Sequence, residues 1–229
     1  MSLIGILLLM LIALSALGYP SLKKRVKIKR WSNALQLDKH QQHYQQLFQN
    51  IDGFVLSRHA RASGDAIEYT YGEIDFISFV ALLSLTKPTN NTIFYDLGSG
   101  IGKAVIACAM VFNVKKSCGI ELFDELHRAA VSQQQLLHQL PGYNSRSINF
   151  IHDDFLHTDF SDATLIFINA TAFFGETWSS IHQHLCKLKS GTVIVTTSKK
   201  LPADCFTVKI QTTVKMSWGL VSAYIHQRI

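Results

Sequence analysis

The fold is indicated most clearly by residues 94–105, which read Phe-Tyr-Asp-Leu-Gly-Ser-Gly-Ile-Gly-Lys-Ala-Val. A short β-rich run, Thr92–Leu97, precedes three closely spaced glycines, and a helical pattern, Lys103–Phe112, follows them. Glycine at a strand-to-helix turn lets the backbone bend sharply and approach a ligand closely. Because ligands of parallel sheets bind at the carboxyl ends of strands, we expect a ligand site on this loop.

Three details of the loop indicate which ligand it binds. Asp96 lies two residues before the first glycine, where a carboxylate suits a cationic ammonium group and would repel a pyrophosphate. The spacing Gly98-x-Gly100-x-Gly102 differs from the GxGxxG of nucleotide phosphate sites. Glu121 closes the next predicted strand, where it can accept both hydroxyls of a ribose. The combination favours S-adenosylmethionine (SAM), with a dinucleotide site and a structural turn as the alternatives.

Helical and β-rich runs alternate from Ile74 onward. The helical patterns cover residues 74–85, 103–112, 122–140 and 178–188, whereas residues 52–70 look irregular. The strand patterns cover residues 92–97, 117–121, 147–152, 165–169 and 192–197, and residues 207–216 and 220–226 resemble a final hairpin. This alternation predicts an α/β protein with a parallel, doubly wound sheet.

Two further positions suit the same ligand. Asp154 and Phe155 follow the third strand, where an acid can bind the adenine amino group and an aromatic ring can cover the base. A loop acid beside a core phenylalanine is the alternative. Asn169 ends the fourth strand, facing the methyl end of the cofactor, and its amide can accept from an amine or donate to the cofactor. A turn-forming asparagine is the alternative there.

The first 22 residues carry no charge, and residues 3–19 read LIGILLLMLIALSALGY. This run is long enough to cross about 30 Å of hydrocarbon. Its positive charges follow it, whereas those of a cleaved signal peptide precede the apolar run. We therefore predict a transmembrane anchor at residues 1–22, with a signal peptide or a buried core helix as alternatives. The basic flank predicts a single-pass membrane protein whose remaining chain faces the cytoplasm.

The net charge of +6 is concentrated at the N-terminal end. Residues 1–30 hold six basic and no acidic side chains, so the rest of the chain is neutral overall. The basic segment Lys23–Arg30 suits anionic lipid headgroups, and the neutral remainder of the chain gives no strong case for a nucleic-acid partner. Residues 33–50 resemble a polar amphipathic linker helix. The predicted organisation is an anchor at 1–22, a juxtamembrane segment and linker at 23–50, and a catalytic domain at 51–229.

The cysteines and histidines predict no metal site. The four cysteines, at positions 108, 118, 186 and 205, have no CxxC spacing and read as buried thiols of a reducing compartment. His182 and His184 are two residues apart, so on a helix they point in different directions.

Read in order, the motifs resemble the catalytic domain of the disruptor-of-telomeric-silencing (Dot-one) family of lysine methyltransferases, which lack a SET domain. The resemblance spans residues 68–229. The motifs are YGE at 71–73, DLGSG at 96–100, GIE at 119–121, DFL at 154–156, INATAF at 168–173, IVTTSK at 194–199, SW at 217–218 and VSAY at 221–224. A second similar group is the membrane-anchored mitochondrial lysine methyltransferases, which share the anchor and the loop.

The resemblance implies a class I methyltransferase (Rossmann-like) fold, with a seven-stranded, mostly parallel sheet and a C-terminal antiparallel hairpin. It also implies methyl transfer from SAM to a protein lysine. Asn169, Phe173 and Trp218 would line the lysine channel and are the candidate catalytic residues. The candidate cofactor-binding residues are Tyr71, Glu73, Asp96, Gly98, Ser99, Gly100, Gly102, Glu121, Asp154 and Phe155.

The chain departs from the family pattern at several positions. Ile74 stands where the family usually has threonine, Lys103 where it has glutamine, and Ala170 where it has a second asparagine. Ala223, beside Tyr224, occupies the place of a channel tyrosine. The basic tail with which the family holds nucleosomes is absent. The cofactor assignment is therefore better supported than a histone substrate.

These observations predict a membrane-anchored, SAM-dependent methyltransferase whose partner is a protein presenting a lysine. Such an enzyme must present a neutral amine, although the unperturbed lysine pKa is about 10.4. Phe173 and Trp218 would desolvate the amine and lower its pKa, and the proton would leave through water without a strong general base. The alternatives are a methyltransferase acting on a small molecule or lipid, and a non-catalytic SAM-binding scaffold at the membrane.

Overall fold

The computed structural model describes residues 23–62, 64, 66 and 69–229. The chain divides into two compact units, Met1–Gln42 and His43–Ile229. In the first unit residues 23–34 are helical, and helix α2, Leu37–Phe48, runs across the boundary. The second unit contains the sheet, the remaining helices and every site residue predicted from the sequence.

Within the described residues, seven strands form one sheet in the order β3-β2-β1-β4-β5-β7-β6. Strands β1 to β5 are mutually parallel, β7 is antiparallel to β5, and β6 is antiparallel to β7. The order reverses between β1 and β4, which is where such sheets bind ligands. The strands are β1 Ile93–Leu97, β2 Lys116–Glu121, β3 Ile148–His152, β4 Leu165–Ile168, β5 Val193–Thr197, β6 Phe206–Met216 and β7 Gly219–Arg228.

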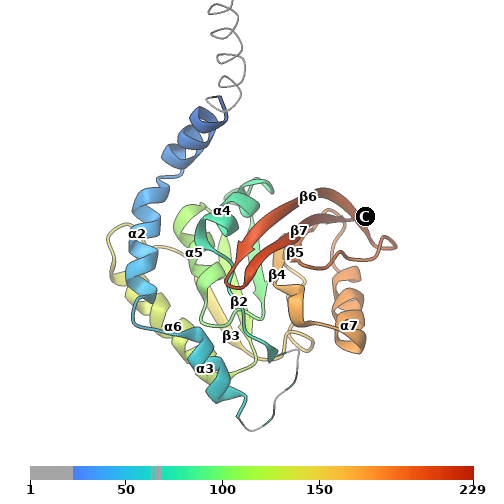
Figure 1. Ribbon diagram of the computed structural model, residues 1–229. Coiled ribbons are helices and arrows are strands. Elements are labelled where there is room, and N and C mark those ends of the chain that lie inside the picture. Colours follow the sequence, from blue (N-terminus) through green and yellow to red (C-terminus); the bar gives the residue numbers. More distant parts are fainter. Residues whose placement is uncertain (1–22, 63, 65, 67–68) are drawn as a thin grey trace, which may run out of the picture. The chain divides into compact units, whose positions relative to one another are not determined.

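Helices cover both faces of this sheet, and Figure 1 shows α5 in green and α7 in orange on opposite sides of it. Successive side chains of a strand point to opposite faces. The Phe79 ring of α4 contacts the rings of Phe94 and Phe167 on one face. Buried side chains on the other face of the sheet form a core cluster with Ile181 and Leu185 of α7. The helices of this unit are α3 Gly53–Ala60, α4 Phe76–Ser84, α5 Lys103–Val111, α6 Asp124–Gln139, the 3-10 turn η2 Ala170–Ala172 and α7 Gly175–Cys186.

The alternating order and the final hairpin confirm the α/β, class I methyltransferase-type sheet expected from the sequence. Two local predictions were wrong. Residues 52–70 include helix α3, which begins where the Asp52 carboxylate accepts the amides of Phe54 and Val55. The helix predicted from residue 74 begins at Phe76, because Asp75 caps it and Ile74 pairs with Met216 of β6.

The cysteine prediction holds for only half of the cysteines. Cys108 and Cys118 are buried free thiols, but Cys186 and Cys205 are joined in a disulfide with a Cα–Cα distance of 5.6 Å. These two residues are 19 positions apart, so no short motif marks them. The end of α7 and the segment before β6 bring them together.

The sequence predicted a single-pass membrane protein with a cytoplasmic domain. For the residues that the structure describes, this prediction was wrong. No helix formed by the described residues is long and apolar enough to cross a bilayer. The predicted anchor, residues 1–22, lies outside the described residues.

A buried histidine makes the fold sensitive to acid. His226 of β7 has no exposed surface, and its Nε2 accepts the Leu201 amide at 3.1 Å. Its Nδ1 lies 3.2 Å from the Ile194 carbonyl, which can accept only if Nδ1 carries the proton. Burial lowers the pKa of His226 from 6.5 to about 4. The neutral ring is therefore the folded form.

Folding stability should fall as the pH drops from 6.5 to about 4. In that range the unfolded chain binds a proton at His226 that the folded chain does not, and the loss is at most about 3 kcal/mol. In urea unfolding followed by circular dichroism, His226→Gln should flatten this pH dependence. The exposed His59→Gln is the matched control and should keep it. Equal slopes for both variants would contradict this account.

Candidate functional site

The loop between β1 and α5 is built on left-handed glycines. Gly100 and Gly102 have φ values of 55° and 82°, a region that side chains rarely adopt. A Cβ on Gly100 would meet the Tyr71 ring, and one on Gly102 would meet the Phe150 ring. The amides of Gly98 and Ser99 both donate to the Ile120 carbonyl, at 2.9 and 3.0 Å. The loop therefore needs glycine for its backbone conformation and for its close neighbours.

Two buried acids flank the loop. Asp96 is 4% exposed near the end of β1, and Glu121 is 6% exposed at the end of β2. Glu121 accepts the Gly100 amide at 2.7 Å and the Phe123 amide at 3.0 Å. Burial raises the pKa of both carboxyl groups, and that of Asp96 is raised well above its usual value, with Glu121 adding to the effect. Such acids gain from a cationic or hydrogen-bond-donating ligand.

A cavity of about 430 Å³ opens at this end of the sheet. All of the predicted cofactor-binding and catalytic residues line it except Gly102 and Trp218. Ser57 Oγ and Ser99 Oγ also line it, and both are buried without a hydrogen-bond partner among the described residues. Buried polar atoms without a partner are rare and indicate a missing partner, here a polar ligand.

Asp154 and Phe155, beyond β3, lie where an adenine was expected. The Asp154 carboxylate accepts the Leu156 amide at 2.8 Å, which fixes the turn. The Phe155 ring contacts that of Phe173 edge-on, with 5.6 Å between centroids. A second aromatic pair, which was not predicted from the sequence, also lines the cavity. It consists of Tyr69 and Phe123, whose ring centroids are 5.1 Å apart. Two aromatic pairs therefore line the cavity.

An ion pair that the sequence did not reveal closes another side of the cavity. The Lys103 ammonium lies 2.5 Å from one oxygen of Glu73, and the Tyr71 hydroxyl donates to the other at 2.9 Å. Burial, the Glu73 charge and that hydrogen bond raise the pKa of Tyr71, so the phenol stays protonated. Lys103 thus replaces the neutral glutamine of the family pattern with a cation held by Glu73.

The side chain of Asn169, at the end of β4, is held by hydrogen bonds to neighbouring residues and is not free in the cavity. Its Nδ2 donates to the Gly72 carbonyl at 3.1 Å. Its Oδ1 accepts the hydroxyls of Thr171, at 3.1 Å, and Thr197, at 2.7 Å. An incoming amine would have to displace one of these hydroxyls. The geometry thus favours a positioning role for Asn169 over direct acceptance of the amine.

Trp218 lies outside the cavity lining. It forms the turn between β6 and β7, is 46% exposed, and its ring packs against Gly72. The neighbouring Ser217 amide donates to the Glu73 carbonyl at 2.8 Å. The turn is thereby held against the Tyr71–Glu73 segment, and a place for Trp218 in the lysine channel stays a prediction.

The family model described as "Histone methylation protein DOT1" matches residues 61–219. A Caenorhabditis elegans protein named histone-lysine N-methyltransferase, H3 lysine-79 specific, is 34% identical over 57% of this chain and 15% of its own length. A Saccharolobus islandicus protein-lysine N-methyltransferase is 34% identical over 37% of this chain and 50% of its own length. The chain therefore spans half or less of these relatives.

Solved structures share the fold. Magnesium protoporphyrin IX methyltransferase from Synechocystis PCC 6803, with bound SAM, matches with a TM-score of 0.54 and 15% identity, over 80% of this chain and 94% of that one. An RNA methyltransferase from Salinibacter ruber, in complex with S-adenosyl-L-homocysteine, matches with a TM-score of 0.53 and 19% identity, over 66% of this chain and 89% of that one. At these identities the likeness concerns the fold alone.

Replacing the buried acid of the loop should weaken SAM binding. Asp96→Asn removes the negative charge while keeping the shape, and we expect an affinity roughly 10- to 100-fold lower, as for a lost charged hydrogen bond. Isothermal titration calorimetry measures it. Asp38→Asn, at an exposed position of α2, is the matched control and should bind like the wild type. Equal affinities of the two variants would remove Asp96 from the site.

SAM binding should release protons from Asp96. Because burial raises the pKa of Asp96 well above its usual value, the free protein keeps the carboxyl proton to a higher pH than an exposed aspartate does, and a cationic ammonium favours the ionised form. Affinity should therefore rise with pH over the range in which Asp96 loses this proton. Titrations in buffers of different ionisation enthalpy count the protons. The heat of binding should depend on the buffer for the wild type, and this dependence should shrink in Asp96→Asn; buffer-independent heats would refute the coupling.

Proposed function

The chain belongs to the histone methylation protein DOT1 family, and on that premise we propose that it transfers methyl groups from SAM to a lysine of a protein. The observation that carries the proposal is the pairing of buried Asp96 and Glu121 around a glycine loop at the switch point of the sheet. The names of the two relatives support a lysine substrate. We further propose residues 51–229 as the catalytic domain, with residues 23–50 leading to it.

The residues of the cavity suit SAM. Asp96 would hold its ammonium group, Glu121 its ribose hydroxyls, and Asp154 with Phe155 its adenine. Ser57 and Ser99 offer two buried hydroxyls that lack partners among the described residues. Lys103 lies on the Glu73 side of the cavity, where it can neutralise a carboxylate of the ligand. The site thus offers opposite charges to both charged groups of an amino acid.

The second substrate must arrive as a neutral amine beside the cofactor. Bound SAM supplies an electrophilic methyl group on a sulfonium centre, and transfer requires the amine in line with it. Phe173 lines the cavity close to Gly98, so its ring can exclude water from the amine and lower its pKa. Asn169, tied to Gly72 and Thr197, would fix the wall against which the lysine packs.

No strong base is required by this arrangement. Asp96 and Glu121 are the buried acids nearest the loop, and we assign both to the cofactor. The ammonium product is a cation, and the faces of Phe173 and Phe155 tolerate it. The proton would leave through water at the open end of the cavity. The substrate class that fits this site is a lysine on an exposed segment of a protein.

Tritiated SAM and a cell lysate test the proposal. The purified chain should label protein bands on a denaturing gel, and Asn169→Ala should reduce the labelling roughly tenfold or more, as for a misplaced reactant. Asn90→Ala, an exposed asparagine before β1, is the matched control and should label normally. Label that partitions into the organic phase would indicate a small-molecule or lipid substrate. Binding of SAM without release of S-adenosylhomocysteine would indicate a non-catalytic scaffold.

A further inference from the structure

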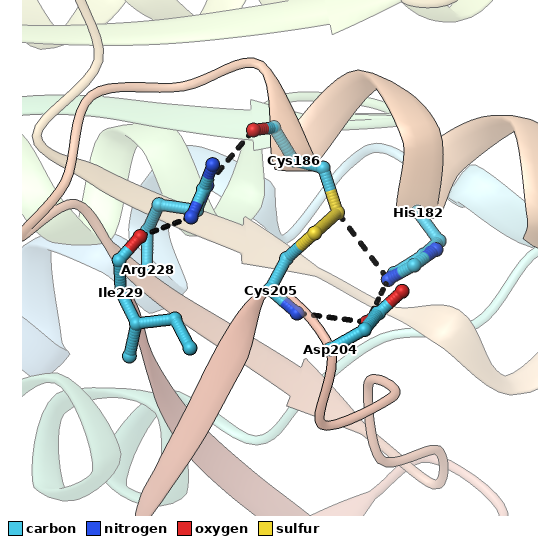
Figure 2. Close-up of a disulfide and its surroundings, with 6 residues drawn as sticks. All are labelled: His182, Cys186, Asp204, Cys205, Arg228 and Ile229. Atoms are coloured by element: carbon cyan, nitrogen blue, oxygen red, sulfur yellow. Dashed lines mark hydrogen bonds and ion pairs between the residues drawn. A yellow bond between two sulfur atoms is a disulfide. The ribbon is translucent and has the colours of Figure 1, made fainter.

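Four side chains with metal-binding atoms meet at the end of α7, away from the cavity residues. They are His182, Cys186, Asp204 and Cys205, and their ligand atoms all lie within 4.8 Å of one another. Figure 2 shows the Cys186–Cys205 disulfide beside the His182 imidazole, which lies between the Cys186 sulfur and the Asp204 carboxylate. His182 Nε2 lies 3.4 Å from Cys186 Sγ and 2.9 Å from Asp204 Oδ1.

The fold holds these residues from several directions. His182 and Cys186 are four apart on α7, so they share one face of the helix. Arg228 Nε donates to the Cys186 carbonyl at 2.8 Å, and the Ile229 amide donates to the Cys205 carbonyl at 3.1 Å. The His182 ring also contacts Phe206, the first residue of β6. The cluster is therefore also held by hydrogen bonds to the main-chain carbonyls of both cysteines and by a ring contact, none of which involves the sulfur atoms.

Two thiolates, an imidazole and a carboxylate form a donor set suited to Zn²⁺. With zinc–ligand distances of about 2.0–2.3 Å, the ligand atoms of a tetrahedral site lie about 3.3–3.8 Å apart. The distance of 3.4 Å from His182 Nε2 to Cys186 Sγ falls within this range, whereas the distance of 2.9 Å to Asp204 Oδ1 is shorter and would have to lengthen on metal binding. A disulfide needs neither the imidazole nor the carboxylate beside it, so the disulfide does not explain why His182 and Asp204 are there.

We propose that the cluster binds one Zn²⁺ when Cys186 and Cys205 are reduced. The disulfide and the metal site exclude each other, because a thiolate that ligates zinc cannot also bond to sulfur. A dithiol reductant supplies two electrons and two protons to the disulfide and is itself oxidised to a disulfide. Zinc then displaces the two thiol protons into solvent. Asp204, whose side chain is 61% exposed, gives the ion a path to the site.

The zinc site would connect helix α7 with the start of β6, the strand at one edge of the sheet. Cys186 ends α7, whose first turn includes Thr177 at the cavity, and Cys205 precedes β6, whose far end leads to Trp218. Either the disulfide or the zinc ion would hold the end of α7 against β6. The cross-link would thus persist in both oxidising and reducing surroundings, with the metal replacing the covalent bond.

Metal content of the full-length chain tests the proposal. Protein reduced under argon with dithiothreitol, then freed of reductant and incubated with Zn²⁺, should retain about one zinc per chain by mass spectrometry of the metal, and oxidised protein should retain none. Reduced protein given Co²⁺ should show the intense visible bands of a tetrahedral site and a thiolate charge-transfer band. Reduced, folded protein that takes up no zinc would overturn the proposal.

Variants locate the ion. Cys186→Ser and His182→Ala should each weaken zinc binding by about tenfold or more, since even outer-shell changes have effects of that size. Asp204→Ala should weaken it too, whereas Asp204→His, which restores a ligand, should retain zinc and shift the cobalt spectrum. Cys108→Ser and His184→Ala are the matched controls. Zinc bound equally by Cys186→Ser, or lost in the controls while circular dichroism shows them folded, would place the ion elsewhere and overturn the proposal.

Discussion

The 2.7 Å hydrogen bond from the Gly100 amide to the Glu121 carboxylate joins the glycine loop to the end of the neighbouring strand. It requires a left-handed residue without a side chain at position 100, because the Tyr71 ring occupies the space beside it. The same carboxylate accepts the Phe123 amide just before α6. A single buried acid thus fixes the loop, the start of a helix and one wall of the cavity. The arrangement is stable only if ligand or protein donors compensate for burying the charge.

The sheet could be predicted from the sequence because its signals are local. Most of the parallel strands are short, largely apolar runs, and Pro88 and Pro141 follow shortly after the ends of α4 and α6. The residues at the ends of β1 to β4 were expected to lie close together, because these ends meet at one edge of a parallel sheet, and the structure brings them to one cavity. What a short window could not reveal is helix α3, whose only clear signal is the capping side chain of Asp52.

The finer features of the site depend on contacts between distant segments, and these could not be predicted. Asn169 is engaged by Thr197, which comes from the next strand, and by Gly72, which lies almost a hundred residues earlier. Lys103 could be recognised as a departure from the family pattern, but its partner Glu73 could not. Trp218 packs against Gly72 but does not itself line the cavity. The pairing of Cys186 with Cys205 likewise depends on where α7 ends in space.

The insertion of β7 between β5 and β6 has a consequence for how the protein is made. Strand β5, with the sequence VIVTT, pairs with β4 on one side and with β7 on the other. During synthesis on a ribosome, its second edge has no partner until residues 219–228 have left the exit tunnel. An apolar strand with an open edge is a site of aggregation. Nascent chains that stall before β7 would therefore be clients for chaperones or proteases, although most of their sheet is complete.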